Sequence, residues 1–115
     1  MVIKSSDCKT ENRENMRGGN GTVKITNFVG KEELYGKGRL FARITLEPGC
    51  SIGEHIHKGD SEIFVIERGC PTYNDGGKTI EAKPGDVLIC PAETGHSVAN
   101  NTDETVDLIA LIVYA

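Results

Sequence analysis

The sequence contains no tryptophan, and its 115 residues include only three tyrosines, three phenylalanines and three histidines. With so few aromatic residues, the core must be aliphatic, built from valine, isoleucine and leucine. Lysine and arginine number 13 against 17 aspartates and glutamates, which gives a net charge of −4. This lack of positive charge argues against nucleic-acid binding, which needs clustered basic side chains for phosphate contacts.

Long apolar runs are also missing. No stretch approaches the roughly 20 apolar residues of a membrane-spanning helix, and Met1–Lys4 leads into polar sequence instead of the apolar run of a signal peptide. We therefore expect a cytoplasmic protein that does not contact a membrane. The chain lacks a Cys-x-x-Cys pair among its four cysteines, so reduced thiols are expected; these are Cys8, Cys50, Cys70 and Cys90.

Turn-forming residues are plentiful. Fourteen glycines and four prolines are typical of short strands joined by turns and not of long helices. About nine short apolar or alternating segments follow one another, with turn signals at intervals of roughly 8–12 residues. A chain of 115 residues with this pattern predicts one domain with a closed or two-sheet all-β fold.

Three segments predict the strands that enclose the core. Arg39–Leu46 alternates between apolar and other residues, as a half-buried strand does. Glu62–Arg68 and Val106–Tyr114 are near-continuous apolar runs, typical of strands that are covered on both faces. Because residues 1–21 are mostly polar, we expect an N-terminal arm there, followed by a single β domain over residues 22–115.

The scarce histidines gather in two stretches, at His55, His57 and His96. Side chains i and i+2 of a strand share a face, so His55 and His57 project into one space. Glu62 follows a turn at Lys58–Ser61, and the returning strand presents it beside the two imidazoles. With His96 arriving from elsewhere, the residues form a four-ligand site built from three strands. Such a set suits one divalent transition metal per chain: Mn, Fe, Co, Ni or Zn.

The spacing of both stretches resembles the two conserved motifs of the cupin superfamily. Gly49–Gly69 matches the first motif, with both histidines and the glutamate at the family's spacing, and Gly85–Asn100 matches the second. The second departs once, because family members usually carry glycine three residues before the last histidine, where this chain has Glu93. Gly95 lies two places later and indicates a rebuilt turn that keeps His96 in place.

The resemblance implies a double-stranded β-helix, the cupin jelly-roll barrel, over residues 22–115, with the metal ligands near one mouth. Cupins include dioxygenases, oxalate decarboxylases, isomerases and non-catalytic binding domains, and the fold does not choose among them. We consider a metal-binding domain that holds a small molecule inside the barrel. The competing hypothesis is a metal-dependent enzyme, either a dioxygenase or a lyase or isomerase, acting on a small organic acid or sugar derivative. In a third alternative the histidines are polar fillers without metal.

Three more side chains are candidates for binding the small molecule: Arg43, Tyr73 and Glu93. Arg43 would bind an anion if its strand face points inward, and is solvated if the apolar face lines the interior. Glu93 either gates the mouth or acts as a base, or is a solvated loop charge. Oxalate-acting relatives often carry Arg or Asn three residues before the first metal histidine. This chain has Ile52 there, which disfavours oxalate as the ligand.

The arm and the outward-facing apolar residues predict contacts between subunits. In cupins similar to this chain, an N-terminal strand packs against a second subunit or exchanges with it; a frayed tail is the alternative. Ile63 and Val65 face outward by parity with Glu62, and Val106–Tyr114 is apolar on both sides. Apolar surface of this kind normally marks an interface, so we expect a homodimer.

Overall fold

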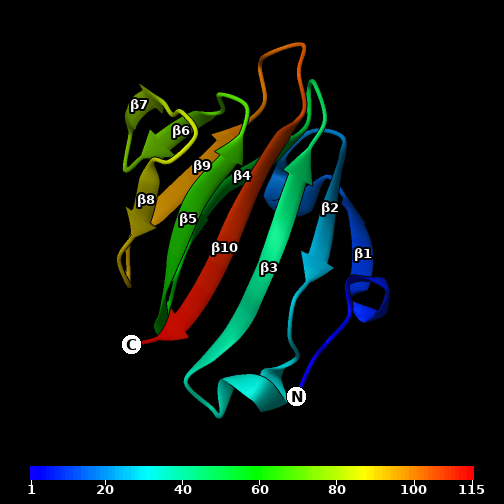
Figure 1. Ribbon diagram of the computed structural model, residues 1–115. Helices are drawn as coiled ribbons and strands as arrows, with labels where there is room; N and C mark the ends of the chain where they lie inside the picture. The colour runs from blue at the N-terminus through cyan, green and yellow to red at the C-terminus, as the bar shows by residue number, and fades with distance from the viewer.

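The structure is a computed structural model that describes all 115 residues. Its elements are strands joined by short connections, with only three 3₁₀ helices (Figure 1). In chain order they are η1 (Ser5–Asp7), β1 (Lys9–Glu14), η2 (Met16–Gly18), β2 (Thr22–Asn27), η3 (Lys31–Leu34), β3 (Gly38–Leu46), β4 (Ser51–Ile56), β5 (Asp60–Arg68), β6 (Thr72–Asp75), β7 (Lys78–Glu81), β8 (Val87–Cys90), β9 (Gly95–Ala99) and β10 (Val106–Tyr114).

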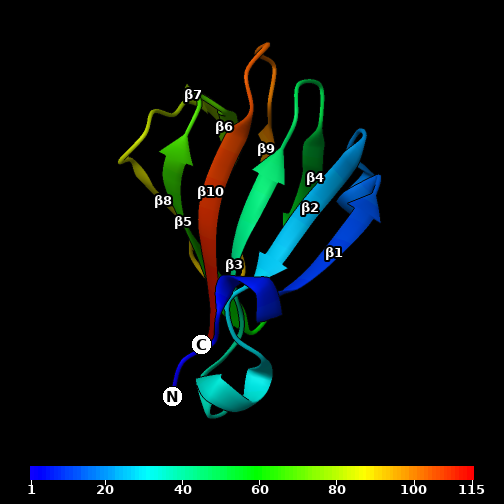
Figure 2. The same ribbon diagram turned by 45° about the vertical axis from the view of Figure 1, so that its right-hand side comes forward.

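The strands form two antiparallel sheets. The six-stranded sheet has the order β1-β2-β3-β10-β5-β8, and the four-stranded sheet has the order β4-β9-β6-β7. Strands that are distant in sequence lie side by side, since β10 pairs with both β3 and β5. The two sheets face each other, with β4 and β9 behind β10 and β3 (Figures 1 and 2). This arrangement confirms the predicted double-stranded β-helix.

The core lies between the sheets and is mostly aliphatic, as the composition predicts, with Phe64 and Tyr73 as its buried aromatic residues. In β3, Ala42, Ile44 and Leu46 are buried, whereas Phe41 on the opposite face is exposed. β5 and β10 also alternate between buried and half-buried residues. The apolar runs that indicated strands covered on both faces therefore have one fully buried face and one half-buried face.

The N-terminal arm joins the sheet of its own chain. β1 pairs antiparallel with β2 from Lys9 opposite Asn27 to Glu14 opposite Thr22. All six β1 residues are exposed, so backbone pairing and not core packing holds this strand. Residues 9–14 thus form the edge of the same six-stranded sheet that carries the barrel strands.

A tight turn joins β6 to β7. Tyr73 lies inside β6, and Gly76 and Gly77 form the turn. All four cysteines are free thiols. No helix in the structure has the length and apolar character needed to cross a membrane.

Candidate metal centre

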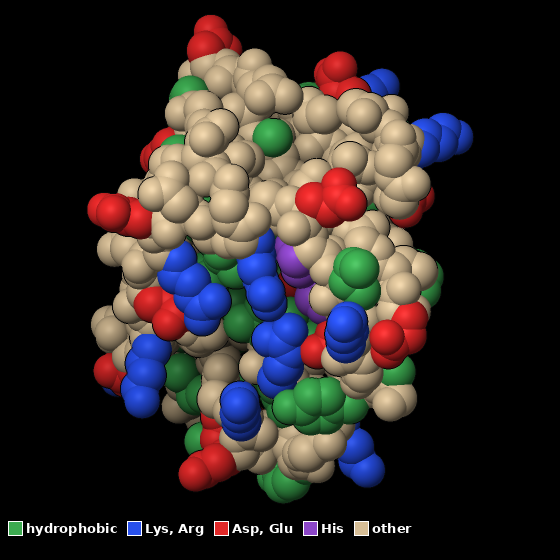
Figure 3. All heavy atoms as spheres, turned by 180° about the vertical axis from the view of Figure 1, so that it is seen from behind, with side chains coloured by type: hydrophobic (Ala, Val, Ile, Leu, Met, Phe, Trp, Pro, Cys, Tyr) green, Lys and Arg blue, Asp and Glu red, His purple; other side chains and the backbone are tan.

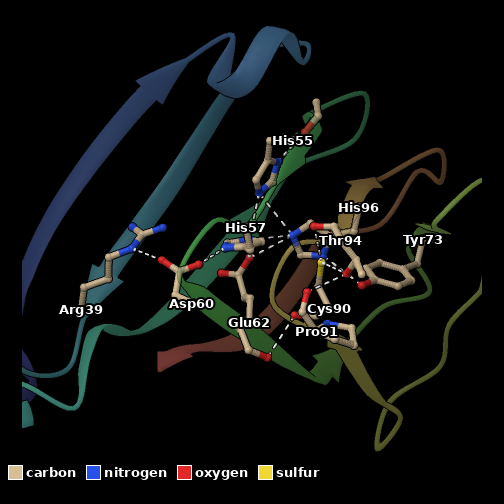
Figure 4. Close-up of polar contacts among 12 residues, drawn as sticks. Arg39, His55, His57, Asp60, Glu62, Tyr73, Cys90, Pro91, Thr94 and His96 are labelled. Atoms are coloured by element: carbon tan, nitrogen blue, oxygen red, sulfur yellow. Dashed lines mark hydrogen bonds and ion pairs between the residues drawn. The ribbon is translucent and has the colours of Figure 1, made fainter. Parts of the chain in front are cut away.

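Both sheets contribute to the histidine cluster. His55 near the end of β4 is directly opposite His96 in β9, and His57 follows β4 immediately. Glu62 is on β5 in the opposite sheet, where it shares the buried face with Phe64. The residues predicted as ligands from four positions in the sequence are thus brought together between the sheets (Figure 4).

The ligand atoms of the cluster converge on one point. His57 Nε2 is 3.2 Å from His55 Nε2 and 3.1 Å from His96 Nε2, and His96 Nε2 is 3.2 Å from His55 Nε2. Glu62 Oε1 is 3.0 Å from His57 Nε2 and 3.1 Å from His96 Nε2. All four ligand atoms lie within 4.8 Å of one another, and three of the four residues are buried.

The other nitrogen of each imidazole is bound from behind. His55 Nδ1 lies 2.8 Å from the carbonyl oxygen of Gly53, and His57 Nδ1 lies 2.7 Å from Asp60 Oδ1. These acceptors require a proton on Nδ1, which leaves the Nε2 lone pair facing the centre. His96 Nδ1 is 2.9 Å from the Tyr73 hydroxyl. When His96 carries its proton on Nδ1, like the other two imidazoles, the hydroxyl oxygen accepts this hydrogen bond.

Such an arrangement of acceptors fits a cation. Three Nε2 lone pairs and a carboxylate oxygen that face one another repel unless a proton or a metal ion lies between them. A set of three imidazoles and one carboxylate is suited to a divalent transition metal and leaves positions open for another ligand. The residues that would hold the ion are therefore His55, His57, Glu62 and His96.

The environment shifts the pKa values of the cluster in opposite directions. The hydrogen bond with Glu62 raises the pKa of His57 above its usual value, against the effect of burial. Burial lowers the pKa of His55. Burial raises the pKa of Glu62, but hydrogen bonds with His57 and His96 outweigh it, so this pKa is lowered overall.

A second layer of residues orients the imidazoles, and the sequence pattern did not reveal it. Asp60 is only 5% exposed; one of its oxygens binds His57, and Oδ2 accepts a 2.8 Å hydrogen bond from Arg39 Nε. The pKa of Asp60 stays low because Arg39 and His57 outweigh its burial. On the other side, Phe64 stacks on His96 at 5.2 Å between ring centroids. Figure 4 shows the line from Arg39 through Asp60 to His57.

Asp60→Ala should weaken metal binding by about 10–100-fold, the usual effect of losing an outer-shell partner. Without the carboxylate, the Nδ1–H of His57 loses its acceptor, and the imidazole is no longer held in the ligand tautomer. Competition between the protein and a chelator for Zn²⁺ measures the change. Asp103→Ala is the control, because Asp103 is exposed and makes no contact with the cluster. Equal affinities in the two variants would contradict a positioning role for Asp60.

The three other candidate residues lie in different places relative to the cluster. Tyr73 is buried behind His96, and burial raises its pKa, so it supports a ligand and does not line the cavity. Arg43 lies on the outer face of β3, where Nε donates a 2.7 Å hydrogen bond to Glu67 and the guanidinium covers the Phe28 ring. The structure therefore does not bring Arg43 to the cluster, because the apolar face of β3 lines the interior.

Glu93 lies in the loop before β9, and its hydrogen bonds connect this loop to the turn after β4. Its backbone N–H donates to the carbonyl oxygen of His57 at 2.6 Å, and its Oε1 accepts a 2.8 Å hydrogen bond from the N–H of Gly59. Its φ is +67°, a left-handed conformation that favours glycine. The turn is therefore kept at Glu93 itself, whereas Gly95 belongs to β9. Glu93 helps to place His57 and faces away from the cavity.

A cavity of about 60 Å³ adjoins the cluster and reaches His55, His57 and Glu62. This volume admits only a molecule of a few heavy atoms. Viewed from behind, Lys and Arg side chains surround a hollow in which histidine side chains are visible (Figure 3). The remaining wall is apolar, except for three arginines that the sequence analysis missed; these are Arg13, Arg17 and Arg39. A larger open groove of about 890 Å³ shares Arg13 and Arg39 but contains none of the cluster residues.

Two facing antiparallel sheets with three histidines and one glutamate between them define a double-stranded β-helix with a candidate metal centre. The chain belongs to the cupin family, since the family model for the cupin domain matches residues 42–114. This match contains all four cluster residues and none of the N-terminal arm.

Matches from Thermotoga maritima extend over nearly the whole chain. The oxalate-binding protein is 39% identical over 113 residues, which cover 98% of this chain and 93% of that protein. The crystal structure of a predicted oxalate decarboxylase has a TM-score of 0.95 at 38% identity and matches over 100% of both chains. A polyketide cyclase from Streptomyces resistomycificus has a TM-score of 0.76 over 100% of this chain and 84% of its own, but at 14% identity it shows the fold alone.

Proposed function

We propose that the protein binds one divalent transition metal through His55, His57, Glu62 and His96, and a small organic acid in the cavity beside it. The observation that carries this proposal is the composition of the cavity wall. Three candidate ligands (His55, His57 and Glu62) and three arginines line a space of about 60 Å³. A bound ion supplies Lewis acidity toward a carboxylate oxygen. The arginines supply hydrogen-bond donors whose geometry matches a carboxylate.

The proposed ligand class includes oxalate, which the sequence analysis disfavoured. Ile52 is buried in the cavity wall and offers no polar group to a carboxylate. The cationic side chains of the cavity come instead from other elements, namely β1, η2 and β3. The similarity to an oxalate-binding protein supports the same class.

Binding is favoured over turnover because the cavity offers no separate proton donor or acceptor. Apart from the cluster residues, its wall consists of arginines and apolar side chains. Tyr73, the nearest phenol, is behind His96 and has a raised pKa. The Glu93 carboxylate already accepts a hydrogen bond from the Gly59 N–H and does not line the cavity. Metal-dependent turnover of a small acid remains the second candidate, supported by the similarity to a predicted decarboxylase.

Calorimetric titration of the metal-loaded protein with oxalate tests this function. We expect saturable binding with one acid per chain in the presence of Mn²⁺ or Zn²⁺, and none after the metal is removed by a chelator. Release of formate or carbon dioxide from oxalate would identify an enzyme instead. If the metal-loaded protein takes up neither oxalate nor a related small acid, the proposed function is incorrect.

A homodimer through the outer face of the six-stranded sheet is part of the proposal. Phe41, Leu111, Ile63 and Ile89 form one row across four neighbouring strands. Ile109 lies in the adjacent row, with two valines on the neighbouring strands; these are Val65 and Val87. Apolar residues gathered on one face of a sheet are typical of an interface that pairs with its own copy. The free thiols fit the reducing cytoplasm that the sequence predicts.

Light scattering at micromolar concentration should give about twice the chain mass of 12.4 kDa. Ile109→Lys should produce the monomer, because it places a charge in the centre of the apolar surface. Ile80→Lys is the control, since Ile80 is an exposed isoleucine on β7 in the other sheet. A wild-type monomer, or equal masses for the two variants, would rule out this interface.

A further inference from the structure

The three arginines of the cavity differ in what they already bind. Arg39 donates to Asp60 at 2.8 Å, and Arg13 donates to Glu11 at 3.0 Å. The Arg17 side chain makes no hydrogen bond or ion pair, although it lines the cavity beside the cluster. Arg17 is therefore the one cavity cation whose charge and donors are uncommitted.

The backbone around Arg17 is held in an unfavourable conformation. Arg17 has a φ of +55° and Asn15 one of +51°, and the left-handed region is strained for arginine but tolerated by asparagine. Local hydrogen bonds maintain the turn, since Asn15 Nδ2 donates to the carbonyl oxygen of Gly19 at 3.1 Å and the Gly18 N–H donates to that of Asn15 at 3.0 Å. The turn thus fixes the direction from which Arg17 approaches the cavity.

Two glycines press this turn against β4. A Cβ atom on Gly53 would lie 2.1 Å from the backbone oxygen of Arg17, and one on Gly19 would lie 2.3 Å from that of Ser51. Neither position therefore accepts a side chain without moving the backbone. The Ser51 N–H and the Asn20 carbonyl oxygen complete the attachment with a 2.9 Å hydrogen bond. The arm and the metal-bearing strand are in direct backbone contact here.

Gly53 also contacts the metal centre. Its carbonyl oxygen accepts the Nδ1–H of His55 at 2.8 Å, while its Cα approaches the backbone of Arg17. One residue therefore sets both the orientation of a metal ligand and the position of the free arginine. Arg17 and three of the candidate ligands, His55, His57 and Glu62, therefore line the same cavity.

From this arrangement we infer that Arg17 is the recognition residue for the second carboxylate of a small dicarboxylate whose first carboxylate faces the metal centre. The inference rests on the proposed function and adds two points to it. The ligand carries two negative charges, and Arg17 is the residue that binds the second. Guanidinium and carboxylate form paired, charge-assisted hydrogen bonds that a monocarboxylate of similar size cannot make at its other end. The site would select dianions over monoanions because the arm adds an uncommitted cation to the cavity that the candidate ligands line.

The test compares Arg17→Gln with Arg43→Gln in the full-length, metal-loaded protein, using oxalate and acetate as probes in calorimetric titrations. Arg43 is the matched control because it is an arginine on the outer face of β3. We expect Arg17→Gln to weaken oxalate binding about 10–100-fold, the effect of losing one charge-assisted hydrogen bond or a pair. Acetate binding should change less than about threefold, and Arg17→Lys should restore part of the oxalate affinity.

Metal content and oxalate affinity together separate the possible outcomes. If Arg17→Gln retains its metal and binds oxalate as tightly as the wild type, or loses acetate affinity to the same extent, Arg17 does not recognise the second carboxylate. If the wild type holds metal but binds neither acid, the proposed function itself has failed.

Discussion

His57→Ala is expected to remove most of the metal from the purified protein, which in the wild type should approach one ion per chain by elemental analysis. His57 Nε2 lies within 3.2 Å of both other imidazole nitrogens and 3.0 Å from Glu62 Oε1. Its loss should lower the affinity by more than the roughly 10–100-fold effect of an outer-shell residue.

A pair of glutamates on β5 provides the matched comparison for this result. Glu62→Gln removes the only carboxylate of the cluster, whereas Glu67→Gln alters the outward-facing partner of Arg43. The first variant should lose metal and the second should keep it. Metal content that is the same in His57→Ala, Glu62→Gln and the wild type would mean that the ion binds elsewhere.

The metal affinity should fall in acid, and the raised pKa of His57 sets where the fall begins. An imidazole binds a metal only when it is neutral, so protons compete with the ion. Because Glu62 and then Asp60 raise the pKa of His57 above 6.5, protonation begins to compete at a higher pH than for an ordinary histidine. Below that pKa, affinity should drop about tenfold per pH unit for each proton displaced. Zn²⁺ titrations across this range measure the slope.

Asn100→Ala should lower the free energy of unfolding by about 3 kcal/mol, without touching the cluster. Asn100 is fully buried, and its Nδ2 donates to the carbonyl oxygens of Leu46 and Glu104. Its Oδ1 accepts hydrogen bonds from the backbone N–H and the hydroxyl of Thr102. Alanine leaves these groups without a partner, at about 1–3 kcal/mol for each one that water cannot reach. Thermal unfolding should shift down by roughly 10–20 °C.

The neighbouring residue serves as the control. Asn101 is exposed and makes one side-chain hydrogen bond, to Thr72 at 3.2 Å. Asn101→Ala should therefore change the unfolding free energy by less than about 0.5 kcal/mol. A similar small effect in Asn100→Ala would show that relaxation or water satisfies the groups around it.

The four candidate ligands were predictable because their arrangement follows from local rules. His55 and His57 are two residues apart, and one turn returns the chain to Glu62. The fold was equally accessible, since alternation in β3 already separates a buried face from an exposed one. Arg43 shows the limit of this reasoning. Its strand has two possible orientations until the sheets are assembled, and the assembled sheets place it outside.

The second layer was not predictable, because it depends on contacts that join separate parts of the chain. Arg39 reaches Asp60 across 21 positions in sequence, and Tyr73 reaches His96 because β6 pairs with β9. Arg17 lay in a polar arm whose backbone contact with β4 no short-range pattern indicates.

The position of the cluster between the sheets connects metal supply to the rigidity of the fold. His55 and His96 belong to the four-stranded sheet and Glu62 to the six-stranded sheet, so an ion bound by these residues would join the two layers. An ion that binds only the closed pair of sheets stabilises it by about 2.7 kcal/mol at a hundredfold excess over its dissociation constant. Amide hydrogen exchange in β4 and β9 should then slow as the free metal concentration rises. The frequency with which the two sheets separate would therefore depend on the metal concentration around the protein.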